Sequence, residues 1–139
     1  MADSPQRSAA ICDASVLAAM IFGEPRADEA CLLTRGRRLL APSLIRYELA
    51  HVAVRKTEAA GADAGQVARA FAAGLGVPIR MVEPSWPAVV ALAREEKLST
   101  YDAAYLQLAL ALQVPLVTLD GRLGAAAHSL GVWATRTAL

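Results

Sequence analysis

The stretch "STYDAAYLQLALALQVPLVTLD" (residues 99–120) decides the fold, because it places a helix directly before a strand. Residues 99–113 are almost wholly apolar, and Ser99 and Asp102 open them in the S-x-x-D form of a helix capping box. Residues 114–120 are apolar and β-branched, which predicts a strand that ends at Asp120. A strand that follows a helix so closely is typical of a parallel sheet, in which helices connect successive strands.

The same alternation runs through the rest of the chain. Strands are expected at 9–13, 38–42, 78–83, 114–120 and 131–135, and helices from 14, at 26–34, 43–60, 64–75, 84–97, 99–113 and 121–130. Successive parallel strands need long right-handed crossovers, so this order predicts a mostly parallel sheet with helices on both faces. The predicted fold class is therefore α/β with three layers.

Length and composition favour one globular domain. The chain has 139 residues, of which 55% are hydrophobic and 19% charged, and we expect a flexible segment at 1–8 before a single domain at 9–139. No stretch is long enough to span a bilayer, and the two cysteines form no disulfide or metal pattern, so we expect a soluble, cytoplasmic protein. The 14 basic and 13 acidic residues give a net charge of +1, so the protein as a whole carries no large positive charge that would attract nucleic acid.

Four acids stand at positions where chemistry is expected. Asp13 and Asp120 close apolar strands, Asp102 begins a helix, and Glu48 lies on the apolar stripe of another helix. Each has a simpler explanation. Asp13 could be an N-cap, Asp120 part of an Asp-Gly turn, and Asp102 part of a capping box. Glu48 could be an exposed acid beside His51. Ligands of parallel sheets bind beyond the carboxyl ends of the strands, so the four side chains are expected to converge there. Carboxylates without cysteine or histidine suit a hard cation such as Mg²⁺ or Mn²⁺.

The motifs that carry these acids resemble those of PIN-domain nucleases, and most closely the VapC-type toxins of bacterial type II toxin–antitoxin pairs. They are "ICDAS" (11–15), "LIRYELAHVA" (44–53), "STYDAAYLQLA" (99–109) and "PLVTLDGRL" (115–123). The resemblance covers residues 9–134 and implies a five-stranded, mostly parallel sheet flanked by helices. It also implies catalytic, metal-binding roles for Asp13, Glu48, Asp102 and Asp120, with Ser15 and Thr118 as supporting hydroxyls. Gly121 departs from the family, which often has a polar or charged residue there.

The function implied by the resemblance is hydrolysis of RNA phosphodiester bonds with Mg²⁺ or Mn²⁺. It further implies a VapB-type antitoxin partner and a homodimer, and the apolar helices at 26–75 are expected to provide a groove for the antitoxin. Because the net charge is close to zero, RNA must be held by local positive charges. The candidates are Arg37, Arg38, Arg46 and Arg122, although Arg37 and Arg38 could also complement the end of the preceding helix.

Other functions were weighed against this one. A non-toxin PIN-domain nuclease of RNA processing and a catalytically silent PIN-fold binding module both remain open. A phosphoacceptor signalling domain needs a lysine at a strand end, but neither Lys56 nor Lys97 ends a predicted strand. A dehalogenase-type phosphatase needs D-x-D, whereas Ser15 occupies the third position here.

Overall fold

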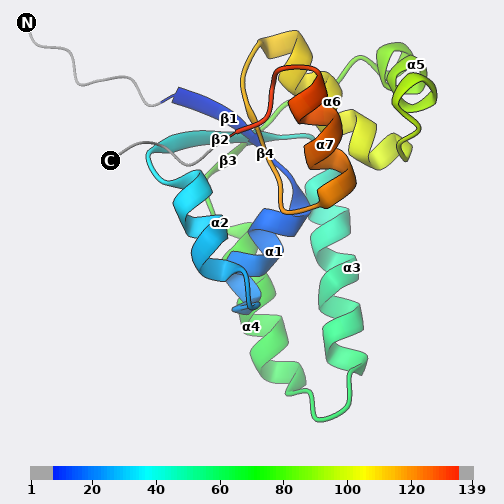
Figure 1. The fold of residues 1–139 in the computed structure, drawn as a ribbon. Coiled ribbons are helices and arrows are strands. Elements are labelled where there is room, and N and C mark those ends of the chain that lie inside the picture. The colour runs from blue at the N-terminus through cyan, green and yellow to red at the C-terminus, as the bar shows by residue number, and fades with distance from the viewer. Residues whose placement is uncertain (1–7, 135–139) are drawn as a thin grey trace, which may run out of the picture.

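The fold is built on a parallel sheet, which the computed structural model describes within residues 8–134. Its strands are β1 (Ser8–Cys12), β2 (Arg37–Ala41), β3 (Ile79–Met81) and β4 (Leu116–Val117). They lie in the order β3-β2-β1-β4, and every pairing between them is parallel (Figure 1). The flexible segment predicted at 1–8 lies outside the described residues except for Ser8, which begins β1 opposite Arg37.

The sheet has four strands and not the five that were predicted. The segment expected as the fifth strand makes one isolated bridge, between Leu116 and Trp133, and position 135 lies outside the described residues. The short β4 explains this difference. Leu116 turns its backbone toward the last segment, where its N–H donates to Val132 and its carbonyl accepts from Ala134, whereas the carbonyl of Val117 faces β1. With a single residue facing outward, β4 offers pairing for one bridge only.

β4 itself is shorter than the predicted strand 114–120. Pro115 has no backbone N–H to donate. Beyond Val117, the amides of Leu119 and Asp120 donate to side-chain hydroxyls of Ser15 and Thr118 instead of to a neighbouring strand. The strand therefore ends where its backbone begins to support polar side chains.

Seven helices flank the sheet within the described residues. All were predicted, and the predicted bounds, which did not include an end for the first helix, lie within two residues of those observed. They are α1 (Ala14–Phe22), α2 (Ala27–Thr34), α3 (Leu44–Glu58), α4 (Ala64–Leu75), α5 (Trp86–Glu96), α6 (Thr100–Leu112) and α7 (Gly121–Ser129). α1 contacts α2, α3 and α4, whereas α6 contacts β1, β4, α5 and α7. The helices thus form two groups around the sheet.

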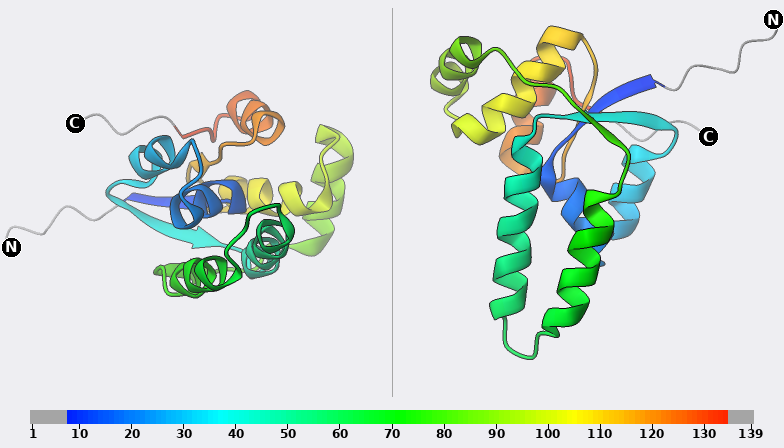
Figure 2. Two further views of the ribbon diagram at one scale, coloured as in Figure 1. Left: turned by 90° about the horizontal axis from the view of Figure 1, so that it is seen from below. Right: turned by 180° about the vertical axis from the view of Figure 1, so that it is seen from behind.

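α3 and α4 form an antiparallel hairpin that extends away from the sheet beside α1 (Figures 1 and 2). The hairpin packs closely against α1 at Gly74. A Cβ atom added there would lie 2.3 Å from Cδ1 of Ile21 and 3.1 Å from Cδ2 of Leu49. Because a real Cβ is not found so close to another atom, a larger residue at this position would force those side chains to move.

The start of α3 is held by Glu83, two residues beyond β3, rather than by a side-chain cap of its own. Ser43 makes no side-chain capping bond, but its backbone N–H donates to the carboxylate of Glu83 at 2.8 Å. The Ser43 hydroxyl, followed by this backbone N–H, holds the pKa of Glu83 below its usual value. The interaction with Glu83 also fixes the first turns of α3, which carry Glu48.

The core is built from small aliphatic side chains around β1, β4 and α6, with Tyr105 as its largest fully buried member. Among the described residues, two polar side chains are buried in it: Asp13 is 4% exposed and Thr118 is 7% exposed. Buried polar groups need hydrogen-bond partners, so these two residues indicate a polar site at the edge of the core. No helix within the described residues has the length and apolar character needed to cross a membrane.

Candidate functional site

Asp13 lies at the carboxyl end of β1 and is the N-cap of α1. Its Oδ1 accepts hydrogen bonds from the Ser15 hydroxyl at 2.6 Å and from the Val16 backbone N–H at 3.2 Å. Its Oδ2 accepts from the Thr118 hydroxyl at 2.6 Å. The capping role predicted for Asp13 is confirmed, and the same side chain is also the centre of a polar network.

The two hydroxyls can only donate toward Asp13, because backbone amides occupy their other side. The Leu119 N–H donates to Ser15 Oγ at 3.0 Å, and the Asp120 N–H donates to Thr118 Oγ1 at 3.0 Å. An amide N–H cannot accept, so each hydroxyl directs its proton to the carboxylate. Both oxygens of Asp13 are therefore required to accept, which fixes its orientation.

Burial is the main cause that raises the pKa of Asp13, to about 6, and the negative charge of Glu48 adds to the increase. The hydrogen bonds from Ser15, Thr118 and Val16 act in the opposite direction, because they stabilise the charged form. Asp13 is thus a desolvated carboxylate with a carboxylate neighbour. A nearby cation would relieve both unfavourable contributions.

Glu48 reaches the same region from the second turn of α3. Its Oε1 accepts a hydrogen bond from the buried hydroxyl of Tyr105 on α6 at 2.5 Å. The sequence suggested His51 as its neighbour, but the hydrogen-bond partner is Tyr105. Burial raises the pKa of Glu48, as does the charge of Asp102, while the Tyr105 hydroxyl lowers it.

Asp102 lies in the first turn of α6, where the Ser99 hydroxyl accepts its backbone N–H at 3.0 Å. This bond confirms Ser99 as the N-cap of the helix. The Asp102 carboxylate is half-buried, and burial followed by the charge of Asp120 raises its pKa. The Ser99 hydroxyl and the charge of Arg122 lower it.

Asp120 completes the group at the N-terminus of α7. Its Oδ1 accepts the Leu123 backbone N–H at 2.8 Å, so it is an N-cap like Asp13, but its side chain is exposed. Asp120 thus has a free carboxylate face toward solvent beside the polar network of Thr118.

The four acids form a chain of neighbouring charges from four different elements. Glu48 raises the pKa of Asp13, Asp102 raises that of Glu48, and Asp120 raises that of Asp102. We call them the acid group. Their donor atoms are all carboxylate oxygens, which Mg²⁺ and Mn²⁺ prefer. Within residues 8–134, no three Asp, Glu, His or Cys side chains are gathered closely enough to form a complete metal-binding cluster.

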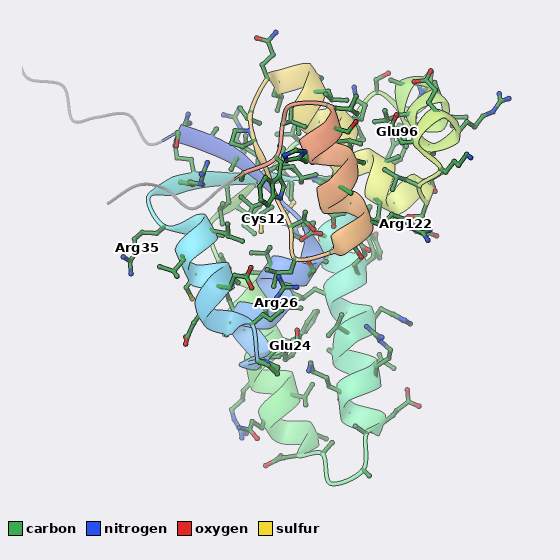
Figure 3. The ribbon with its side chains drawn as sticks, viewed as in Figure 1. Cys12, Glu24, Arg26, Arg35, Glu96 and Arg122 are labelled. Atoms are coloured by element: carbon green, nitrogen blue, oxygen red, sulfur yellow. The ribbon has the colours of Figure 1, made fainter. Side chains whose placement is uncertain are left out.

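A cavity of about 910 Å³ adjoins the acid group between α1 and α3. Ser15 and Glu48 line it, together with the exposed ring of Tyr47. Arg26, which precedes α2, also lines it and lies beside the loop before α7 (Figure 3). Its guanidinium donates to the Leu119 carbonyl at 2.9 Å, so this arginine is part of the wall of the site.

The arginines predicted to hold RNA are spread over the fold. Arg37 and Arg38 pair with Ser8 and Ala9 at the amino ends of the strands. Asp13 follows the opposite end of β1. Because a strand rises about 3.3 Å per residue, the length of β1 separates Asp13 from these arginines. Arg46 is exposed in the first turn of α3, and Arg122 is close enough to Asp102 for its charge to lower the pKa of that carboxyl. The acid group therefore has Arg122 nearby, but not Arg37 or Arg38.

Two residues of the site were not predicted in their roles. Tyr105 is buried and donates a hydrogen bond to Glu48. The signal was present, since Tyr105 lies one helical turn after Asp102 on a helix expected to be buried. Arg26 gave no signal, because its contact with Leu119 joins residues far apart in the sequence.

Comparison with known proteins identifies the family and the fold. The family model described as "PIN domain" matches residues 10–129. PAE2754 from Pyrobaculum aerophilum has a similar structure, with a TM-score of 0.69 and 24% identity over 86% of this chain and 79% of that one. So does VapC20 from Mycobacterium tuberculosis, a toxin that cleaves the sarcin–ricin loop, with a TM-score of 0.63 and 17% identity over 92% and 99%. No curated protein matches the sequence.

Proposed function

This chain belongs to the PIN-domain family, and on that basis we propose that it is an endoribonuclease that hydrolyses RNA phosphodiester bonds with Mg²⁺ or Mn²⁺. The convergence of Asp13, Glu48, Asp102 and Asp120 is the observation that carries the proposal. These residues come from distant parts of the sequence, and separate capping roles do not require them to meet. Neighbouring charges raise the pKa values of Asp13, Glu48 and Asp102, and a shared cation would relieve this repulsion.

The donor atoms are all carboxylate oxygens, which suit a divalent cation in kind. In this proposal the four acids would hold the ion, although within residues 8–134 no three of them are gathered into a complete cluster. When bound, such an ion supplies an activated water and stabilises negative charge on the phosphate and the leaving oxygen. Asp13 contributes a carboxylate whose orientation is fixed by two hydroxyls. The Tyr105 hydroxyl holds one oxygen of Glu48 and leaves the other available.

The residues around the acid group bind and orient RNA in this proposal. Arg122, in the first turn of α7, provides positive charge beside a group of acids that would otherwise repel phosphate. Arg26 is paired with Glu29 at 2.9 Å and shapes the wall of the cavity. Tyr47 and Tyr101 are exposed and line the cavity, where unpaired bases can stack.

We further propose that the protein is the toxin of a VapBC-type pair, that it acts in the cytoplasm and that it forms a homodimer. Its likeness in fold to the toxin VapC20 supports this assignment. The cavity between α1 and α3 has apolar walls that include Leu44 and Val52, so it can accept a segment of an antitoxin. A homodimer and an antitoxin would both be detected by co-purification from the native operon.

Inducible expression in bacteria tests the proposal in cells. The wild-type protein is expected to arrest growth and to produce cleaved RNA, whereas Asp13→Asn is expected to do neither. Asp28→Asn is the matched control, because Asp28 is an exposed acid on α2. Growth arrest by Asp13→Asn would remove the link between the acid group and toxicity.

Two other functions are distinguished when RNA cleavage and RNA binding by the purified protein are measured alongside this experiment. A non-toxin nuclease of RNA processing would cleave RNA in vitro without arresting growth. A silent binding module would do neither, and its RNA binding would survive Asp13→Asn.

A further inference from the structure

A second hollow, of about 380 Å³, lies next to the acid group on the side away from α3. We call it the Trp133 pocket. Its walls come from α2, from the loop after β4, from α7 and from the last described residues, and they include Arg26, Thr118, Asp120, Gly124, His128 and Trp133. Thr118 and Asp120 belong to the polar network around Asp13, so the pocket is continuous with the proposed catalytic site.

Trp133 is held as a fixed aromatic surface in this pocket. The residues on both sides of it bind β4, since Leu116 donates to the Val132 carbonyl and accepts from the Ala134 N–H. The His128 ring packs against the indole edge to face, with centroids 5.5 Å apart and an interplanar angle of 65°. Trp133 is nevertheless 45% exposed. A large aromatic ring that is fixed on one side and open on the other is prepared for stacking.

Gly124 lies beside the Nε1 edge of the indole. A Cβ atom at this position would lie 3.7 Å from Nε1 of Trp133 and 3.7 Å from Cγ2 of Thr118. These are ordinary contacts, so alanine would fit, but it would occupy space in the pocket. Alanine at this position would therefore narrow the pocket beside the indole without straining the backbone.

We propose that the Trp133 pocket binds one unpaired nucleobase of the RNA substrate, stacked on Trp133, at a nucleotide next to the bond that is cleaved. The inference rests on the proposed function, because RNA is the ligand that the adjoining acid group would process. Bases are planar and stack on tryptophan irrespective of sequence, and they do not require a charged partner. The pocket offers that surface beside Asp120, where a strand leaving the catalytic site would pass.

Neutral nucleosides test the pocket without metal and without cleavage. In a Trp86→Phe background, Trp133 is the sole tryptophan of the chain, so its fluorescence reports on the pocket. Adenosine, guanosine, cytidine and uridine are titrated separately, with ribose as the control. We expect saturable quenching by at least one nucleoside and none by ribose. The Gly124→Ala protein should fold normally, because the added Cβ makes ordinary contacts, and should bind the nucleoside more weakly. Absence of saturable quenching by all four nucleosides would overturn the proposal.

RNA cleavage separates the pocket from the nuclease activity. Trp133→Leu is expected to raise KM roughly 5- to 150-fold with little change in kcat, because the indole contacts a base and not the reacting phosphate. Trp86→Leu is the matched control, since Trp86 is 53% exposed on α5 and does not line the pocket. Unchanged cleavage by Trp133→Leu would refute the pocket and leave the nuclease standing. Nucleoside binding by a protein that never cleaves RNA would refute the nuclease and leave a base-binding site.

Discussion

Replacing Thr118 by valine removes the hydroxyl that donates a hydrogen bond to Asp13 but keeps the shape of the side chain. The hydroxyl donates to Asp13 at 2.6 Å and accepts the Asp120 N–H at 3.0 Å, and the residue is 7% exposed. A hydrogen bond to a charged group contributes about 1.5–3 kcal/mol, and the amide left without a partner adds about 1 kcal/mol. The extra methyl offsets about 0.8 kcal/mol. The free energy of unfolding should therefore fall by roughly 2–3 kcal/mol.

Urea or guanidinium unfolding of the metal-free protein measures this loss. Thr57→Val is the matched control, because Thr57 is exposed on α3 and donates to the Ala53 carbonyl at 2.8 Å, so its replacement should stay within about 0.5 kcal/mol. Thr118→Ser keeps the hydroxyl and should keep most of the Mg²⁺-induced stabilisation that Thr118→Val loses. A Thr118→Val protein no less stable than the Thr57→Val protein would show that this hydroxyl does not hold Asp13.

Three further substitutions test other parts of the account. Tyr105→Phe leaves the buried ring in place but frees Glu48, so Mg²⁺ should raise the melting temperature less than in the wild type; an equal rise would exclude this positioning role. Gly74→Ala should destabilise the protein by about 1–3 kcal/mol in denaturant unfolding, whereas Gly65→Ala in the same helix should be neutral or stabilising, and equal effects would contradict the close packing of α4 on α1. Asp102→Asn should leave the metal-free protein as stable or more stable and abolish cleavage, since it removes one of several repelling charges; a destabilised but active variant would make Asp102 a helix cap only.

Much of the fold could be predicted because local chemistry and the global arrangement agree. The helix starting at Ser99 was predicted from its capping residue, and the hydroxyl of Ser99 does cap it. The parallel order of the strands followed from their alternation with helices. The fifth strand was wrong because pairing depends on which backbone groups a neighbour leaves free, and Leu116 alone faces that segment.

The candidate site was predictable as a set of acids but not as a network. Asp13 and Asp120 follow strands, so the edge of the sheet at which they meet could be inferred. The bond between Tyr105 and Glu48 joins two helices that are distant in the sequence, and neither local periodicity nor spacing encodes it. The contact of Arg26 with Leu119 is of the same kind, since it depends on the packing of complete elements.

Cleavage of RNA by the purified protein, with and without chelation, tests the central claim most directly. The wild-type protein is expected to cleave RNA with Mg²⁺ or Mn²⁺, to lose this activity in EDTA and to regain it when excess metal is added. The Asp13→Asn protein, prepared identically, is expected to be inactive under all three conditions. Cleavage that persists in EDTA, or that the Asp13→Asn protein retains, would contradict a metal-dependent nuclease built on the acid group.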